Sequence, residues 1–222
     1  MKTEKIKYPF SWEERRPVLK EQVFFVPNYY EEHLGSIFPS WSHEDLFGND
    51  RPVYIEYCSG NGEWIIKKAQ ENPNSNWVAV EKKFERVRKI HSKKRTMGVN
   101  NLVIIAGEAL TFTKEYLQES SADSIFINFP DPWPKQRHAK YRLLQETFIS
   151  HLKRITREKG KINIVTDSEP YVNQIITEFA KVDGLMKSIC SEADSYGTSY
   201  FDRLWRSKGL AIHYLEYFKQ EG

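Results

Sequence analysis

The sequence predicts an α/β fold in which a mostly parallel sheet carries an antiparallel strand pair at one edge. From residue 53 onward, short apolar runs alternate with segments whose apolar residues recur at helical spacing. Strands that alternate with helices imply right-handed crossovers and parallel strands. Two further apolar runs follow the last of these helices, and a polar loop links them, which predicts the antiparallel edge. The 222 residues and 40% hydrophobic content suit one large domain with a full core.

The first half of the predicted domain alternates regularly. An apolar run at 53–58 reads as a strand, and Ser59, Gly60, Asn61 and Gly62 form a tight turn behind it. A helix over 63–70 and a strand over 77–81 follow. Helical spacing of apolar residues predicts the next helix over 83–97, before a strand at 102–106, a helix at 113–118 and a strand at 124–129.

In the second half, a basic tract opens a helix whose apolar face runs to Ile155. A strand over 160–166 and a helix over 171–179 come next. The last two strands are expected at 185–190 and 210–218.

Residues 1–50 show no clean period, although they contain many aromatic side chains. We expect an N-terminal arm that packs on or beside the main domain, with a short helix near 29–34. A turn over 49–52 ends this arm. The predicted organisation is therefore an arm, 1–50, followed by the main α/β domain, 51–222.

Composition narrows the class of protein. No apolar run approaches the length of a membrane span, and the N-terminus lacks the apolar core of a signal peptide. Cys58 and Cys190 are too few for a disulfide framework, and the histidines lack metal-ligand spacing, so no metal is expected. A cytoplasmic protein without membrane contact is expected. The net charge of +3 says little, but the basic residues are clustered, as in proteins that bind a polyanion.

The most informative stretch runs from Phe129 to Arg142. Three prolines within five positions prevent both strand and helix, so a rigid turn must display Asp131 and Trp133 beyond a buried strand. A carboxylate, an indole and adjacent cations indicate a site for a base and its phosphates. The alternative is a proline-rich loop with a solvated basic face. The cationic residues of the tract are Lys135, Arg137, His138, Lys140 and Arg142.

A second group of candidates lies where predicted parallel strands end, which is where ligands bind in open α/β sheets. Gly60 and Gly62 follow the first strand, Glu81 ends the second in a position to bind a ribose diol, and Glu108 follows the third. Glu56 lies inside the first strand. The turn lacks a full Gly-x-Gly-x-x-Gly motif, and Glu56 and Glu63 would repel a pyrophosphate, so S-adenosylmethionine, whose amino and sulfonium groups are cationic, is favoured over NAD. An ordinary strand-to-helix turn is the alternative interpretation of the glycines.

The string Phe-Pro-Asp-Pro-Trp-Pro-Lys at 129–135 with its basic tail resembles the bacterial tRNA (guanine-N7-)-methyltransferases, and the resemblance covers about 53–209. It implies a Rossmann-like class I S-adenosylmethionine-dependent fold. It also implies methyl transfer to a guanine of the tRNA variable loop, giving 7-methylguanosine and S-adenosylhomocysteine. A neighbouring carboxylate, Asp131, would stabilise the positive charge that methylation leaves on the guanine.

The resemblance also implies roles for individual residues. Asp131 would stand between cofactor and target base. Cofactor contacts are implied for Glu56, Gly60, Gly62, Glu81, Glu108 and Asp131. Contacts to tRNA are implied for Lys135, Arg137, His138, Lys140, Arg142, Asp167, Thr198, Ser199, Tyr200 and Phe201.

Three departures from the family pattern stand out. Cys58 occupies the place of the first glycine, and Glu108 replaces the usual aspartate. The acid near Thr198 is absent at Phe201 and occurs only at Asp202, where a one-residue slip of the loop could restore it.

Two other functions remain open from the sequence. One is an amino-methyltransferase of another substrate, although such enzymes begin the corresponding turn with an acid or amide before two prolines. The other is a catalytically silent RNA-binding module that kept the fold. Either a monomer or a homodimer is compatible with the sequence.

Overall fold

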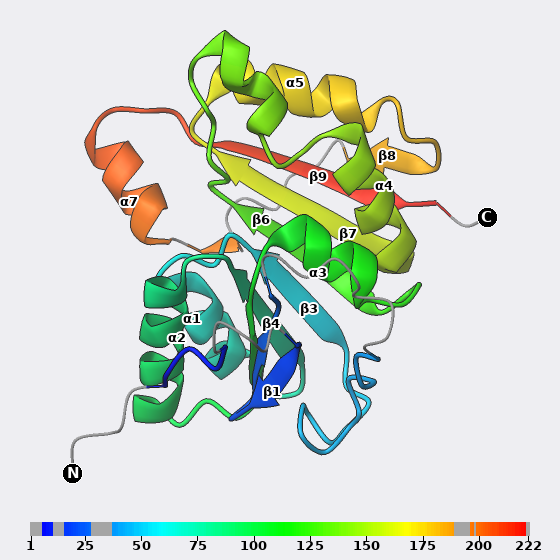
Figure 1. The fold of residues 1–222 in the computed structure, drawn as a ribbon. Helices are drawn as coiled ribbons and strands as arrows, with labels where there is room; N and C mark the ends of the chain where they lie inside the picture. The colour runs from blue at the N-terminus through cyan, green and yellow to red at the C-terminus, as the bar shows by residue number, and fades with distance from the viewer. Residues whose placement is uncertain (1–5, 11–15, 28–36, 189–195, 198, 221–222) are drawn as a thin grey trace. The chain divides into compact units, whose positions relative to one another are not determined.

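The computed structural model describes residues 6–10, 16–27, 37–188, 196–197 and 199–220. The chain forms two compact units, 1–117 and 118–222. Figure 1 shows their helices and strands. Among the described helices, none has both the length and the apolar character needed to cross a lipid bilayer.

The parallel strands of the first unit have their carboxyl ends at the same edge of the sheet. Its strand order is β1-β2-β5-β4-β3. Strands β2, β5, β4 and β3 are parallel to one another, and β1 is antiparallel to β2. The bounds are β1 (Val18–Lys20), β2 (Val23–Phe25), β3 (Val53–Tyr57), β4 (Asn76–Glu81) and β5 (Leu102–Ala106).

Two helices cover this sheet because each has an apolar stripe. Helices α1 (Glu63–Glu71) and α2 (Phe84–Thr96) lie side by side (Figure 1) and bury residues such as Ile65 and Ile90 completely. Both agree closely with the predicted helices.

The third helix begins earlier than predicted. Helix α3 (Ala109–Glu115) starts four residues before the expected 113, because the Glu108 side chain caps it by accepting a hydrogen bond from the Thr111 amide at 2.7 Å.

The second unit has the predicted antiparallel edge. Its strand order is β6-β7-β9-β8, with β6 parallel to β7, β9 antiparallel to β7, and β8 antiparallel to β9. Helices α4 (Glu146–Ile155) and α5 (Glu169–Phe179) pack together against β7, and bury Phe148 and Tyr171. The strand bounds are β6 (Ala122–Asn128), β7 (Thr156–Thr166), β8 (Leu185–Lys187) and β9 (His213–Lys219).

Two predictions for this unit are wrong. The basic tract does not open α4: it forms a separate 3-10 helix, η2 (Gln136–Tyr141), which ends because Arg142 is extended. The polar loop before β9 contains helix α7 (Tyr200–Ser207), capped by the Ser199 hydroxyl, which accepts from the Asp202 amide at 3.1 Å. Helix α7 was not predicted because it has only eight residues, although Phe201, Leu204 and Trp205 recur in it at helical spacing.

The N-terminal region contributes the strand pair β1–β2, which the sequence did not predict. The pair turns at Glu21 and Gln22, both in the left-handed region with φ of 52° and 56°. Phe25 is fully buried in the sheet. The predicted helix at 29–34 lies outside the described residues, and the boundary between arm and domain at residue 50 stays a prediction.

Candidate functional site

The turn after β3 requires unusual backbone conformations. Cys58, Gly60 and Gly62 have φ values of 62°, 56° and 75°, all in the left-handed region. Gly62 also packs so closely on α2 that an added Cβ would lie 2.8 Å from Cγ1 of Ile90. A side chain at Gly62 would therefore push the turn away from the helix, so glycine is needed there.

Glu81 connects this turn to the end of the neighbouring strand. The Glu81 side chain is 5% exposed, and its Oε2 accepts a hydrogen bond from the Gly60 amide at 2.9 Å. Its Oε1 accepts from the Lys83 amide at 2.8 Å. The predicted ribose-binding carboxylate thus lies directly against the glycine turn.

The other two predicted carboxylates lie in the same unit. Glu108 is half-buried, and its Oε2 caps α3 by accepting from the amide and hydroxyl of Thr111. Glu56 is 1% exposed and lies in the carboxyl half of β3. Register pairs Tyr57 with Val80 and Glu81 with Ala106, so these acids follow one edge of the sheet.

This half of the site fits a cationic nucleoside and not a pyrophosphate. Two carboxylates are almost completely buried, and the turn presents glycines where a ligand would approach the backbone. A buried carboxylate favours a cationic partner because it cannot be screened by water, and Glu81 already has one in Arg86, whose Nη1 lies 3.7 Å from its Oε2. The donor set therefore suits the amino and sulfonium groups of S-adenosylmethionine.

The proline turn of the second unit is bounded by two residues in the left-handed region. Phe129, with φ of 48°, donates from its amide to the Val165 carbonyl at 2.8 Å. Trp133 has φ of 40°, and its amide donates to Oδ1 of Asp131 at 3.1 Å. Bulky residues rarely adopt this conformation, at a cost of roughly 1–3 kcal/mol each. The backbone at Asp131 is thus fixed on both sides, while its side chain is exposed.

Arg142 holds this turn in place from inside the protein. It is 4% exposed, and its Nε donates to the Pro132 carbonyl at 2.7 Å. Its Nη1 donates to Oε1 of Gln174 at 2.5 Å, and its Nη2 donates to the Trp133 carbonyl at 3.4 Å. The guanidinium also lies 5.1 Å from the ring centroid of Tyr171. We therefore replace the prediction that Arg142 contacts tRNA with a proposal that it positions the turn.

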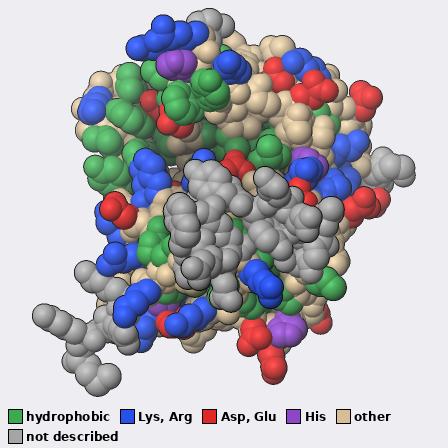
Figure 2. Space-filling view, viewed as in Figure 1, with side chains coloured by type: hydrophobic (Ala, Val, Ile, Leu, Met, Phe, Trp, Pro, Cys, Tyr) green, Lys and Arg blue, Asp and Glu red, His purple; other side chains and the backbone are tan. Residues whose placement is uncertain are grey.

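The remaining cations of the tract are available to a ligand. Lys135, Arg137 and Lys140 are exposed, and His138 is half-buried. In Figure 2, basic and histidine side chains gather with hydrophobic ones at the top of the view. Basic side chains interleaved with aromatic rings are typical of surfaces that bind nucleic acid.

The predicted substrate residues near α7 differ in their surroundings. Tyr200 is 46% exposed, and the Phe201 ring lies 6.1 Å from that of Phe129. Ser199 caps α7. Thr198 lies outside the described residues, and Asp167 is half-buried just after β7.

Asp202 does not supply the missing acid of this segment. It is 2% exposed, and its Oδ1 accepts from Nε of Arg206 at 2.8 Å. Its Oδ2 accepts from the Tyr214 hydroxyl at 3.0 Å. Burial raises the pKa of Tyr214, which keeps this hydroxyl protonated as a donor. Both oxygens of Asp202 are thus used inside the protein.

Sequence reasoning missed Gln174 and Tyr171, the partners of Arg142. Both lie in α5, about thirty residues from Arg142, and α5 reads as an ordinary amphipathic helix. No local pattern links them to the turn. The signal available at Arg142 was that two leucines, Leu143 and Leu144, follow it directly in the sequence.

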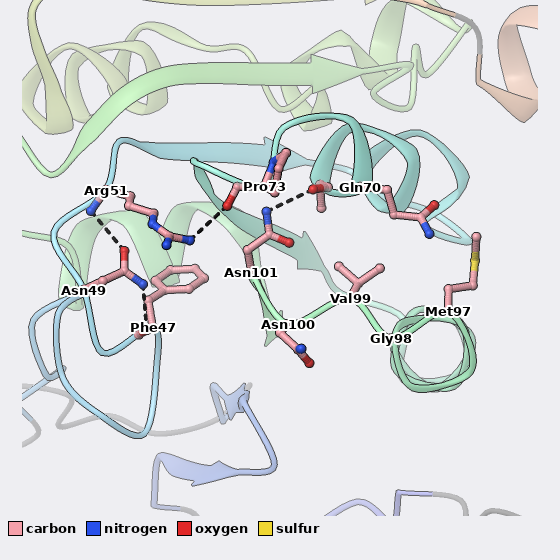
Figure 3. A pocket seen from close by; sticks show the side chains of 11 residues that line it. Phe47, Asn49, Arg51, Gln70, Pro73, Met97, Gly98, Val99, Asn100 and Asn101 are labelled. Carbon is pink, nitrogen blue, oxygen red and sulfur yellow. Dashed lines mark hydrogen bonds between the residues drawn. The ribbon is translucent and has the colours of Figure 1, made fainter.

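A pocket of about 530 Å³ lies elsewhere in the first unit (Figure 3). It is bordered by segments that precede β3, β4 and β5, including Arg51, Pro73 and Asn101. Arg51 donates to the Pro73 carbonyl at 2.9 Å, and Asn101 donates to carbonyls at three positions. None of the predicted site residues lines this pocket, and its polar side chains mainly join loops to one another.

Comparisons with known proteins support the fold. A family model described as "Putative methyltransferase" matches residues 50–213. Among solved structures, the 16S rRNA methyltransferase KamB is similar with a TM-score of 0.62 at 17% identity, over 84% of this chain and 96% of that one. That likeness supports the class I methyltransferase fold.

Relatives of known name cover the whole chain. The tRNA (guanine-N(7)-)-methyltransferase of Chlamydia caviae is 45% identical, over 100% of both chains. The protein of the same name from Chlamydia felis is 45% identical, over 100% of this chain and 99% of its own. Such identity over full length shows that the chain belongs to the tRNA (guanine-N7-)-methyltransferase family.

Proposed function

We propose that this protein transfers the methyl group of S-adenosylmethionine to N7 of a guanine in the tRNA variable loop, in the cytoplasm. The observation that carries the proposal is Asp131, fixed by the strained turn after β6 and followed by exposed cations. Full-length similarity to enzymes of this name supports the reaction. Whether the protein acts as a monomer or a homodimer stays a prediction.

The first unit provides the residues that hold the cofactor. Glu81 accepts hydrogen bonds from the ribose hydroxyls, and Glu108 accepts one from the adenine amine. The negative charge of Glu56 balances the positive charge of the amino and sulfonium groups. The turn at Gly60 and Gly62 lets the ligand approach the backbone. When bound, S-adenosylmethionine supplies an electrophilic methyl group on a sulfonium.

The second unit provides the residues that hold the substrate. Guanine N7 carries an unprotonated lone pair at neutral pH, so no general base is needed to make it nucleophilic. The main task of the protein is to orient the base for transfer. Lys135, Arg137, His138 and Lys140 bind phosphates, with further contacts from Asp167 and from Ser199, Tyr200 and Phe201.

Asp131 acts on the charge that the reaction creates. The new bond at N7 leaves the guanine ring positive, and a fixed carboxylate stabilises that charge as it develops. The same carboxylate can accept a hydrogen bond from N1–H or from the 2-amino group of guanine, and adenine has neither of these donors. Because its turn is fixed by the protein, Asp131 needs little reorganisation during transfer.

Replacing Asp131 tests this role directly. We expect Asp131→Ala to lower kcat by about 100-fold or more, because a preorganised charge is lost. The KM for tRNA should change much less than kcat, since the exposed cations Lys135, Arg137 and Lys140 remain to bind phosphates. Asp131→Asn keeps the size and the acceptor for the Trp133 amide, and should be almost as inactive. Full activity in either variant contradicts the role of Asp131.

The overall reaction is tested with methyl-labelled cofactor and unmodified tRNA, followed by nucleoside analysis. We expect the label in 7-methylguanosine alone. Label in another nucleoside would overturn the assignment. If calorimetry detects no binding of S-adenosylmethionine, the protein is instead a silent RNA-binding module.

A further inference from the structure

Three aromatic rings meet on the surface of the basic tract. The ring centroid of Trp133 lies 5.7 Å from that of His138 and 5.6 Å from that of Tyr141. The His138 and Tyr141 centroids are 6.0 Å apart. The planes are inclined to one another by 51° to 89°, so the rings form a triangle and do not stack. We call Trp133, His138 and Tyr141 the aromatic platform.

The platform is exposed although its rings are large. Tyr141 is 57% exposed and Trp133 is 37% exposed. Other aromatic residues of the same unit, such as Phe148, Tyr171 and Phe179, are almost completely buried. Exposed aromatic surface among cations is a common feature of sites where bases stack.

We propose that the aromatic platform stacks one unpaired nucleobase of the RNA substrate, with Tyr141 as the main stacking surface. The inference rests on the proposed function and adds a base contact beyond the phosphate contacts of the tract. Every base has a planar face, so this contact does not select a particular base. It favours an unpaired nucleotide, because the face of an unpaired base is accessible for stacking.

The charges around the platform match this ligand. Lys140 Nζ lies 5.2 Å from the ring centroid of Tyr141, over a face of that ring. Lys135, Arg137 and Lys140 are all exposed beside the rings. An arriving base replaces the Lys140 ammonium over Tyr141, and the freed ammonium binds the phosphate of the same nucleotide.

The platform is held ready before RNA binds. Trp133 is fixed through its amide by Asp131 and through its carbonyl by Arg142. Tyr141 ends η2, where the Arg142 amide donates to the Ala139 carbonyl at 3.1 Å. Gln145 Nε2 donates to the same Ala139 carbonyl at 2.9 Å. The rings therefore lose little conformational freedom when the base stacks.

Kinetics of Tyr141 variants test the platform. We expect Tyr141→Ala to raise the tRNA KM by about 10-fold, the effect of losing one stacked base, with kcat changed by less than about twofold. Tyr141→Phe keeps the stacking face and should match the native enzyme. Tyr141→Leu keeps apolar volume without a planar face, and should resemble Tyr141→Ala.

Salt dependence separates stacking from charge. The slope of log KM against log salt should be unchanged in Tyr141→Ala, because no phosphate contact is lost. It should fall by roughly 0.7 to 0.9 in Lys140→Met, which removes one cation. A changed slope in Tyr141→Ala would show that the residue acts through the charged tract, and would overturn the proposal.

The stacked base is located with tRNAs that carry one abasic nucleotide in the variable loop. At one position, removal of the base should raise the KM of the native enzyme by the same factor as Tyr141→Ala raises it on intact tRNA. The KM of Tyr141→Ala should not rise further with that abasic tRNA. Additive losses at all positions would contradict stacking by Tyr141.

Failure of the platform and failure of the proposed function give different results. If the native protein forms no 7-methylguanosine, the proposed function fails. The platform is then tested by binding of a fluorescently labelled oligouridylate. Tyr141→Phe should bind as the native protein does, and Tyr141→Ala about 10-fold more weakly. Equal binding by both variants would reject the platform on its own.

Discussion

At the scale of single residues, Cys58 has a backbone conformation that suits glycine better than cysteine. Its φ of 62° lies where glycine is at ease and a side chain is strained. We expect Cys58→Gly to raise the free energy of unfolding by about 1 kcal/mol, the usual cost of a left-handed non-glycine residue. Chemical denaturation measures this.

Cys58→Ala is the matched control. It removes the thiol but keeps the Cβ, so it should give no such gain. If both variants are stabilised equally, the thiol and not the backbone is the cause. The titration should include S-adenosylmethionine, because a side chain that faces the ligand would also weaken its binding, and glycine would then improve affinity.

The sequence could reveal single residues only where they follow strands or prolines. Glu81 and Asp131 were predicted because a strand end and a proline turn constrain where a side chain can point. Arg142 was assigned to RNA because it belongs to a basic tract, but it is buried and bonded to Gln174 in another helix. A contact of that kind depends on tertiary packing, which no local pattern encodes.

At the scale of elements, the proline turn depends on the Arg142 guanidinium, which donates hydrogen bonds to the Pro132 and Trp133 carbonyls. We expect Arg142→Met to lower the free energy of unfolding by about 2–3 kcal/mol, because the part-buried carbonyls of Pro132 and Trp133 and the Gln174 side chain lose a charged donor. It should also lower kcat, since Asp131 is no longer fixed. Arg142→Lys should rescue neither effect, because an ammonium cannot reproduce the fork of a guanidinium.

Arg137→Met is the matched control for the turn. Arg137 is exposed, so its loss should change the free energy of unfolding by no more than about 0.5 kcal/mol. Its loss should reduce the salt slope of the tRNA KM, whereas Arg142→Met should leave that slope unchanged. The opposite pattern would return Arg142 to the RNA-binding set.

Elements with a strong hydrophobic period were predicted well, and those without one were not. Strand β5 and helix α2 were predicted within one residue at each end. The pair β1–β2 was missed because each strand has only three residues. Helix η2 was missed because a 3-10 helix of six residues does not show the α-helical repeat.

At the scale of the whole molecule, a buried lysine makes stability depend on pH. Lys94 is 6% exposed, and burial lowers its pKa to about 8. Between this value and the ordinary lysine pKa of 10.5, the unfolded chain binds more protons, so stability rises with pH. Between about pH 7.5 and about pH 9.5, the free energy of unfolding should therefore rise by roughly 2 kcal/mol because of Lys94.

The comparison with Lys94→Met isolates that contribution. Lys94 Nζ donates to Oε1 of Gln22 at 2.5 Å, and His91, Glu21 and Arg95 lie in the same cluster. Burial lowers the pKa of His91 below its usual range, so His91 does not titrate in this window. Native and variant proteins should converge in stability as pH rises. Parallel pH curves would show that Lys94 keeps its ordinary pKa.

The division of the chain into two units has a consequence for how such enzymes diversify. Apart from Asp131, the proposed cofactor residues lie between positions 56 and 108, in the first unit, and the proposed RNA contacts lie beyond position 130, in the second. Mutations that change the nucleic-acid target therefore fall on a stretch of chain separate from the one that binds the methyl donor. Selection can change the target while the methyl-donor chemistry is inherited unaltered.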